Sequence, residues 1–383
     1  MSHHDKHIIS QLRDLVGTPS VSSTDPSWDQ GNRAVIELLA GWLSALGFRT
    51  EIMDVSPDGQ KANLIATLGS GPGGLVLAGH TDTVPFDEGR WRSDPLRLTE
   101  RDQRLYGLGS TDMKGFFPIA IAAARAFLDK PLQQPLIILA TADEESSMDG
   151  ARALAAAGRP RARAAIIGEP TSLNPVRLHK GIMMEAIEVT GLAGHSSNPA
   201  LGINALDVMH ELMSELMLFR RQLATEHTNS AFEVAFPTLN LGCIHGGDSP
   251  NRICGRCELH FDLRLTPSAA AAGVREQLQQ RLQALAQARG AGIALRSLVE
   301  PVPPFEQVAH SELVRLAEKL TGHSALAVGF ATEAPFLQAM GMETIVMGPG
   351  SIDRAHQPDE YLELSQIQPC VDLLQSCIAH YCL

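Results

Sequence analysis

The chain contains the stretch Leu75-Val76-Leu77-Ala78-Gly79-His80-Thr81-Asp82, a short apolar run that gives way at once to polar residues. Runs this short are typical of strands buried on both faces, as in parallel sheets covered by helices. Three further runs have the same form, at residues 136–140, 164–167 and 344–347. Helical patterns lie between the runs, at residues 32–46, 115–128 and 311–320. This alternation predicts an α/β domain built on a mixed, mainly parallel sheet covered by helices.

The middle of the chain follows a different pattern, in which strands and helices occur in the order βαββαβ. Residues 258–265 form its clearest strand, because polar and apolar side chains alternate strictly there, as in a strand with one face in water. This order is that of the split, ferredoxin-like arrangement. The Pro-rich residues 301–304 that follow mark a linker. We therefore expect a catalytic domain of residues 1–181 and 304–383, with an inserted lid domain of residues 182–303.

The charge balance of the chain limits its partners. Among 383 residues, 31 Lys and Arg stand against 43 Asp and Glu, which gives a formal net charge of −12. Nucleic acids and anionic membranes bind basic surfaces, so neither is an expected partner. No apolar run approaches the length of a membrane span, and the N-terminal segment lacks the apolar core of a secretion signal. We expect a soluble, cytoplasmic protein.

Two short motifs are better explained by a structural role than by metal binding, redox chemistry or cofactor binding. Cys254 and Cys257 have CxxC spacing, but no second pair completes a zinc ribbon, and Cys257 opens a strand whereas redox pairs start a helix. Residues 69–74 satisfy the GxGxxG pattern of dinucleotide-binding proteins, yet they precede a predicted strand instead of following one. We therefore expect two structural cysteines and a turn between strands.

Side chains that can bind metal ions follow each of the four apolar runs. In order, they are His80 and Asp82, Glu144 and Glu145, Glu169, and His356 after a Gly-Pro-Gly turn. The carboxyl ends of parallel strands meet at one edge of a sheet, so these side chains should converge there. Asp112 lies just before the helix that starts near Gly115, where it could be a further ligand or only a helix N-cap.

Each of these residues also has an ordinary structural explanation, as a solvated acid at a helix start or a hydrogen-bonded histidine. A metal site explains all of them together. Histidine mixed with carboxylates suits zinc, cobalt or manganese better than magnesium or calcium, which prefer shells of oxygen alone. One carboxylate can bridge two ions about 3.5–4 Å apart, as in two-metal hydrolases. The ligands are numerous enough for two ions.

Five motifs occur in a fixed order along the chain. They read Gly-His-Thr-Asp-Thr-Val-Pro at 79–85, Gly-Leu-Gly-Ser-Thr-Asp-Met-Lys-Gly at 107–115, Asp-Glu-Glu at 143–145, Gly-Glu-Pro-Thr at 168–171 and Ala-His-Gln-Pro at 355–358. In these motifs the chain resembles the co-catalytic zinc aminoacylase and peptidase family (M20). The resemblance extends over nearly the whole chain, the middle domain included.

The resemblance implies two divalent metal ions in each subunit, with zinc the expected metal and cobalt the alternative. Asp112 would bridge the two ions. His80 and Glu169 would complete one metal site, and Glu145 and His356 would complete the other. All five ligand positions match the motifs of the family.

The resemblance also implies roles in catalysis. Glu144 would be the general base that activates a water bridging the metals, and Asp82 would orient the His80 ring. His195 would reach the active site of the neighbouring subunit and stabilise the oxyanion, which implies a homodimer formed through the lid domain. For Ser196 and Ser197, the two residues after His195, we expect only helix N-caps.

The implied substrate is a small N-acyl amino acid. Further motifs at residues 89–95, 251–254, 332–336, 350–352 and 356–363 resemble members that hydrolyse the amide of N2-acetyl-L-ornithine to L-ornithine and acetate in arginine biosynthesis. Arg252, beside Asn251, would bind the α-carboxylate, and Thr332 and Glu333 would line the pocket, with Glu333 facing the cationic side chain. An N-acetylcitrulline deacetylase, a succinyl-diaminopimelate desuccinylase, a dipeptidase and a non-catalytic metal-binding relative remain as alternatives.

Overall fold

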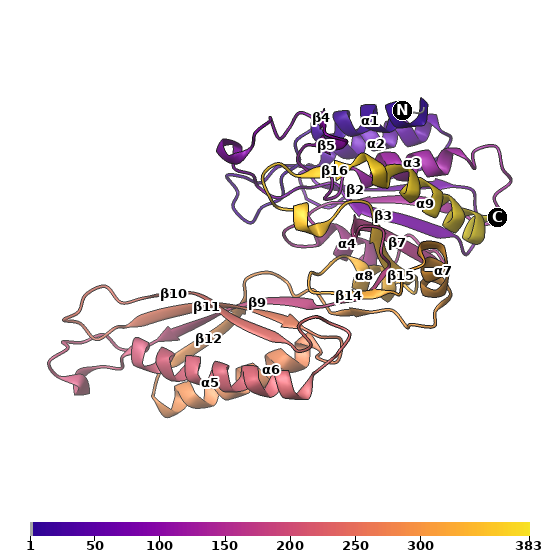
Figure 1. Cartoon of the computed structure of the whole chain (residues 1–383). Helices are drawn as coiled ribbons and strands as arrows, with labels where there is room; N and C mark the ends of the chain where they lie inside the picture. The colour runs from indigo at the N-terminus through magenta and orange to yellow at the C-terminus, as the bar shows by residue number, and fades with distance from the viewer. Residues whose placement is uncertain (1–2) are drawn as a thin grey trace. The chain divides into compact units, whose positions relative to one another are not determined.

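The computed structural model describes residues 3–383, which form two compact units (Figure 1). Unit 1 comprises Met1–Arg177, Gln307–Leu326 and Thr332–Leu383, and unit 2 comprises Leu178–Glu306 and Ala327–Ala331. The predicted lid, residues 182–303, falls within unit 2.

Unit 1 is built on a mixed sheet, which confirms the predicted α/β class. Its strands lie in the order β1-β2-β6-β3-β7-β15, and Val176 of the short strand β8 pairs with Val346 of β15. Neighbours among β6, β3, β7 and β15 run parallel, and these four are the apolar runs of the sequence. The strands are β1 (Arg49–Asp54), β2 (Ala62–Leu68), β3 (Leu75–His80), β6 (Leu136–Thr141), β7 (Ala164–Pro170), β8 (Val176–His179) and β15 (Glu343–Gly348).

Helices cover the sheet because both faces of its central strands are apolar. Leu75 and Leu77 of β3 share one core cluster with α1, α2, α3, α7 and α9 (Figure 1). Helices α4 and α8 lie outside that cluster and pack against each other. The helices are α1 (His3–Val16), α2 (Arg33–Ala45), α3 (Phe116–Arg125), α4 (Asp149–Ala157), α7 (Glu312–Thr321), α8 (Ala334–Ala339) and α9 (Ile367–Cys382). Among the helices of residues 3–383, none has the length and apolar character that crossing a membrane requires.

A small second sheet in unit 1 joins distant parts of the sequence. Its strands lie in the order β16-β5-β4, all antiparallel, and comprise β16 (Tyr361–Glu363), β5 (Arg104–Tyr106) and β4 (Thr99–Arg101). The pairing of β16 with β5 connects the segment after His356 to the segment before Asp112. Short 3₁₀ helices occupy Glu88–Arg90, Ile352–Arg354 and Leu364–Gln366.

Unit 2 has the predicted βαββαβ order and an antiparallel sheet in the order β10-β11-β9-β12. Leucines of α5 and α6 share a core cluster with the apolar side chains of β11, so both helices cover one face of the sheet (Figure 1). The elements are β9 (Gly181–Thr190), η2 (Pro199–Leu201), α5 (Ala205–Glu226), β10 (Thr238–Gly246), β11 (Arg256–Leu265), α6 (Ala271–Ala288) and β12 (Gly292–Ser297), with the short strands β13 (Phe305–Glu306) and β14 (Leu326–Val328) near the unit boundary.

The positions of the GxGxxG stretch and of the CxxC pair agree with the structural roles that we expected for them. Residues 69–74 connect β2 to β3, so they form a turn between strands and open no helix. Cys254 and Cys257 are buried free thiols, and Cys257 lies at the start of β11. In the part of the chain that the structure describes, neither cysteine belongs to a group of side chains with metal-binding geometry.

Candidate metal centre

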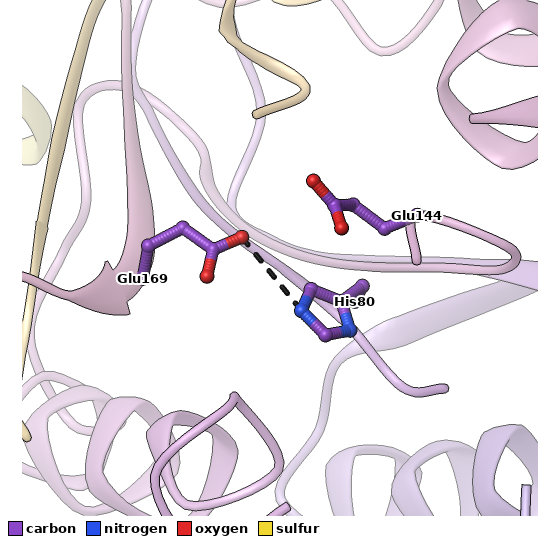
Figure 2. Close-up of side chains that lie close together, drawn as sticks. All are labelled: His80, Glu144 and Glu169. Atoms are coloured by element: carbon purple, nitrogen blue, oxygen red, sulfur yellow. Dashed lines mark ion pairs between the residues drawn. The ribbon is translucent and has the colours of Figure 1, made fainter. Parts of the chain in front are cut away.

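The ends of three parallel strands bring the predicted ligands of unit 1 together. His80 is the last residue of β3, and Glu169 lies near the end of the neighbouring strand β7. Glu144 and Glu145 lie in the turn that follows β6, whose residue Thr141 pairs with His80. The side chains of His80, Glu144 and Glu169 converge in Figure 2 as the sheet topology predicts.

Asp112 lies between two histidines. Its Oδ1 atom is 3.2 Å from Nε2 of His80, and its Oδ2 atom is 3.2 Å from Nε2 of His356. A carboxylate whose two oxygens face two different ligands has the arrangement that a bridge between two ions requires. The alternative of a helix cap is wrong, because α3 has Gly115 at its N-cap and no side chain caps it.

The other acidic ligands extend this arrangement on both sides. Glu169 Oε1 lies 3.7 Å from His80 Nε2, the contact drawn in Figure 2, and Glu145 Oε1 lies 3.0 Å from His356 Nε2. Glu144 offers a carboxylate oxygen within 4.8 Å of ligand atoms of both His80 and Glu169. A second group with ligand atoms equally close to one another joins His80, Asp112 and Glu145.

Asp82 connects the His80 ring to the turn after β6. The Nδ1 atom of His80 donates to the backbone carbonyl of Asp82 at 3.0 Å, which turns Nε2 of the ring towards Asp112. The Asp82 Oδ2 atom accepts the backbone N–H of Glu145 at 3.1 Å. Its Oδ1 atom is buried, lies 3.7 Å from His80 Nδ1 and has no hydrogen-bond partner.

Burial and mutual repulsion make this group of acids hard to ionise without a cation. Burial, together with the charge of Glu169, raises the pKa of Glu144 well above its ordinary value. Burial likewise raises the pKa of Glu169 and of Glu145. Hydrogen bonds to Asp112 and Glu145 raise the pKa of His356 to about 10.

Asp112 and His80 behave as an ion pair. Burial opposes ionisation of Asp112, but its hydrogen bonds to His356 and His80 lower its pKa. Burial lowers the pKa of His80, yet the charge of Glu169 and the hydrogen bond to Asp112 outweigh it and raise that pKa well above its ordinary value. Divalent cations bound here would balance the charge of these buried carboxylates. The donor set of histidine nitrogens and carboxylate oxygens therefore fits two ions of the zinc or cobalt type.

The turn that carries Glu144 is fixed by its neighbour Asp143. Asp143 has a φ of +59°, an unfavourable conformation for a residue with a side chain, and its carbonyl accepts the backbone N–H groups of residues 146–148. Its Oδ1 atom accepts hydrogen bonds from Ser22 Oγ and Lys61 Nζ, each at 2.7 Å. These contacts could not be predicted from local sequence patterns, because Ser22 and Lys61 are far from Asp143 along the chain.

Thr332 and Glu333 belong to unit 1 and lie at the start of α8. The Thr332 hydroxyl accepts the backbone N–H of Ala334 at 3.1 Å. Glu333 is buried, and its Oε1 atom has no hydrogen-bond partner. Burial raises the pKa of Glu333 to about 7, against a hydrogen bond from Thr141 and the charge of His80, which lower it. Glu333 is thus a buried acid with one unpaired oxygen, and its pKa responds to the charge of His80, a proposed metal ligand.

His195, Asn251 and Arg252 belong to unit 2, where they are neighbours. The backbones of His195 and Arg252 form an isolated antiparallel bridge, and Ser196 N–H donates to the carbonyl of Asn251 at 3.2 Å. The side chain of Arg252 is exposed and pairs with Asp248. The structure therefore groups these three predicted residues within unit 2.

The expectation that Ser196 and Ser197 are helix N-caps is wrong. The following helices are capped by Asn198 and Asn204, whose side chains accept backbone N–H groups. Ser197 instead contacts His195: its backbone N–H donates to Nδ1 at 3.2 Å, and its Oγ lies 2.8 Å from the same atom. A backbone N–H can only donate, so Nδ1 of neutral His195 is an acceptor and its Nε2 carries the proton.

A small cavity of about 190 Å³ borders His356 in unit 1. Apolar side chains make up much of its wall, including Val84, Phe86, Trp91 and Leu108. Arg90 and Asp87 add charge at the same cavity. The cavity therefore brings apolar, charged and amide side chains together beside His356.

Comparison with known proteins agrees with this geometry. A model of peptidase family M20/M25/M40 matches residues 76–380. The acetylornithine deacetylase of Pasteurella multocida is 50% identical over 368 residues, which cover 96% of each chain. Among solved structures, an M20 family metallo-carboxypeptidase from Sulfolobus solfataricus has a TM-score of 0.77 at 18% identity and covers 99% of both chains. A dinuclear metal-binding peptidase of the M20 family from Bacillus subtilis has a TM-score of 0.69 at 16% identity and covers 98% of both chains. The chain therefore belongs to peptidase family M20/M25/M40.

Proposed function

We propose that the chain hydrolyses the amide of N2-acetyl-L-ornithine to L-ornithine and acetate, as a cytoplasmic enzyme of arginine biosynthesis. The likeness to the Pasteurella multocida acetylornithine deacetylase, 50% identical over nearly the whole length of both chains, supports this substrate. The observation that best supports the reaction class is that the two oxygens of Asp112 face two different histidines. The acids around Asp112 need cations to be stable in their ionised form. This is the donor arrangement of a two-metal hydrolase.

Five residues would hold two divalent ions, Zn²⁺ in the first place and Co²⁺ as the alternative. Asp112 would be shared, with His80 and Glu169 on one side and Glu145 and His356 on the other. When bound, the ions would supply Lewis acidity, which acidifies water and polarises the amide carbonyl.

Glu144 would move the proton. Its carboxylate would accept a proton from the attacking water while the water oxygen forms a bond to the acetyl carbon. As the C–N bond breaks, Glu144 would return that proton to the nitrogen of the leaving amine, so the products are acetate and ornithine. Its position beside His80 and Glu169 supports this role. Asp82 would keep the His80 ring in the orientation that exposes Nε2 to the ions.

His195 would act across a homodimer, with the partner subunit's His195 stabilising the oxyanion at each active site. The neutral ring of His195 carries its proton on Nε2, which makes that atom a hydrogen-bond donor, as an oxyanion requires. Exposed apolar side chains of unit 2, among them Leu192, Leu201 and Ile244, support an interface between copies.

Four residues would form the rest of the substrate site. Arg252 would exchange its contact with Asp248 for the α-carboxylate, with Asn251 beside it. Glu333 would pair with the δ-ammonium group of ornithine, and its unpaired buried oxygen supports this assignment. Thr332 would hold Glu333 in place through its contact with the start of α8.

A substrate panel tests the proposal. The zinc-loaded protein would be assayed on N2-acetyl-L-ornithine, N-acetyl-L-citrulline, N-succinyl-diaminopimelate and simple dipeptides. We expect the highest kcat/KM for acetylornithine. A preference for one of the other three would replace the substrate but keep the reaction class, whereas absence of turnover on all four would contradict the proposed activity.

A further inference from the structure

Glu360 is a buried acid on the segment that follows His356. It is 2% exposed, and its carboxylate accepts three hydrogen bonds from backbone N–H groups. Gly109 N–H donates to Oε2 at 3.0 Å, and the N–H groups of Thr111 and Asp112 donate to Oε1 at 2.8 and 2.9 Å. The donors lie about 250 residues earlier in the sequence, in the loop that carries Asp112.

Further contacts join the same two segments. Gly107 N–H donates to the carbonyl of Glu360 at 3.1 Å, and Thr111 Oγ1 donates to the carbonyl of Tyr361 at 2.8 Å. The loop of residues 107–112 has no regular secondary structure, so its N–H groups depend on such partners. Glu360 satisfies three of them with one side chain, and this makes it the central partner of the loop.

We propose that Glu360 is a positioning residue of the metal centre, which holds the backbone of Asp112 so that both oxygens of Asp112 reach their ions. The inference rests on the proposed function, in which Asp112 bridges two metals. Glu360 also lies four residues after His356, so it fixes the segments of two proposed ligands relative to each other.

Glu360 acts through Asp112 and is no ligand itself. Both of its oxygens are directed to backbone donors, and an acid bound in this way has little capacity left for a cation. Burial, and after it the charge of Asp112, disfavour the ionised form of Glu360 and raise its pKa. The three N–H donors that point at this carboxylate offset part of this cost.

The test is Glu360→Gln, an exchange of nearly equal shape. In the variant, the amide NH₂ of Gln replaces one carboxylate oxygen and cannot accept a hydrogen bond from the backbone. At least one hydrogen bond is therefore lost, and one backbone N–H is left unpaired. We expect zinc to bind the metal-free variant about 10–100-fold more weakly than the wild type in a calorimetric titration. Hydrogen exchange of residues 109–112 in the metal-free variant should also become faster.

Glu363→Gln is the matched control. Glu363 ends the short strand β16, which begins directly after Glu360, but its side chain is half exposed and pairs with Arg104 instead of the backbone of residues 107–112. We expect zinc affinity and hydrogen exchange of residues 109–112 to match the wild type.

The outcomes separate this inference from the proposed function. Wild-type protein that binds no zinc would contradict the metal centre itself. If the wild type binds zinc and Glu360→Gln binds it with an affinity within about twofold of the wild type, only the role of Glu360 is overturned. This holds even if the variant is less stable than the wild type. If Glu360→Gln does not fold, Glu360→Asp takes its place: it keeps the charge but is too short to reach all three donors, and we expect the same loss of affinity. Unchanged affinity in that variant would equally overturn the inference.

Discussion

Glu144 is the residue on which the proposed chemistry depends most. Replacing it by Gln keeps the size of the side chain but removes its capacity to accept a proton. We expect kcat to fall by about 10²–10⁴-fold while zinc content stays at the wild-type level. Asp149→Asn, an exposed change in the same region, is the control and should leave both quantities unchanged. Near-normal kcat in Glu144→Gln would show that another group moves the proton.

Glu333 is expected to set the preference for a cationic side chain. Acetylornithine and acetylcitrulline have similar length, but only the first has an ammonium group for the unpaired Oε1 of Glu333. In Glu333→Gln we expect the ratio of kcat/KM for the two substrates to shift towards acetylcitrulline by about 10–100-fold, the value of one hydrogen bond to a charged group. An equal loss on both substrates would indicate that Glu333 supports the site without reading the side chain.

The buried ring of His179 in β8 is expected to make the free energy of unfolding depend on pH, independently of any metal. Its ring is buried against Phe305, and burial lowers its pKa to about 4 from an ordinary value of 6.5. The unfolded chain takes up a proton below pH 6.5, whereas the folded chain does so only near pH 4. The contribution of His179 to stability is therefore complete above pH 6.5 and is lost as the pH falls from 6.5 to about 4, by about 3 kcal/mol in total.

The comparison of His179→Gln with wild type isolates this effect. Denaturant titrations at about pH 7 and about pH 4.5 should show a smaller acid-induced loss of unfolding free energy in the variant, because it has no group to protonate there. His323→Gln changes an exposed histidine and should keep the wild-type loss. Equal losses in all three proteins would contradict the prediction.

At the scale of elements, the turn after β6 depends on a contact from the connection between β1 and β2. Lys61 Nζ lies 2.7 Å from Asp143 and 2.8 Å from Asp29, and the Asp143 side chain is only 7% exposed. Lys61→Met would leave this buried acid with its hydrogen bond from Ser22 but without a cation. We expect the free energy of unfolding to fall by about 1–3 kcal/mol, and kcat to fall because Asp143 holds the turn of Glu144.

Lys319→Met is the control for this prediction, because Lys319 is exposed near the end of α7. It should leave stability and kcat near the wild-type values. A loss of stability in Lys61→Met with unchanged kcat would mean that the turn keeps Glu144 in place without the lysine.

The parallel strands and the candidate ligands at their ends could be identified from the sequence because each signal is local. A short apolar run followed by a polar residue marks both a buried strand and its carboxyl end, as in β3 with His80 and β7 with Glu169. Helices α4 and α8 were not predicted, since they are short and their apolar residues form no long periodic pattern.

Contacts between distant segments could not be predicted in this way. Nothing local to Ser197 shows that its N–H contacts His195 instead of starting a helix, and nothing local to Lys61 points to Asp143. Glu360 is an intermediate case. It lies in the motif of residues 356–363, one of the motifs on which the resemblance to the family rests. Only the folded chain shows that its side chain binds the loop of Asp112.

For the molecule as a whole, the acidic composition now has a partial structural explanation. Five of the 43 acidic residues, Asp82, Asp112, Glu144, Glu145 and Glu169, lie in one buried centre in unit 1. A centre of this kind needs cations to be stable in its ionised form. Part of the net charge of −12 therefore reflects a binding site for small cations.

The proposed homodimer makes a prediction that concerns two copies of the chain at once. Glu144→Gln and His195→Ala should each be nearly inactive alone. If each active site uses the partner subunit's His195, a hybrid dimer of the two variants has one complete site, because the subunit with intact Glu144 receives an intact histidine from its partner. With random pairing half of the dimers are hybrids, so the mixture should recover about a quarter of wild-type activity.

The matched control combines Glu144→Gln with Glu169→Ala. Both changes affect unit 1 of their own subunit, so no hybrid of this pair contains a complete site, and mixing should restore nothing. Recovery only in the first mixture would tie His195 to the partner's active site, and sedimentation analysis should then show a dimer. No recovery in a mixture that does form hybrids would mean that each subunit uses its own His195, and a monomer in sedimentation would contradict the dimer itself.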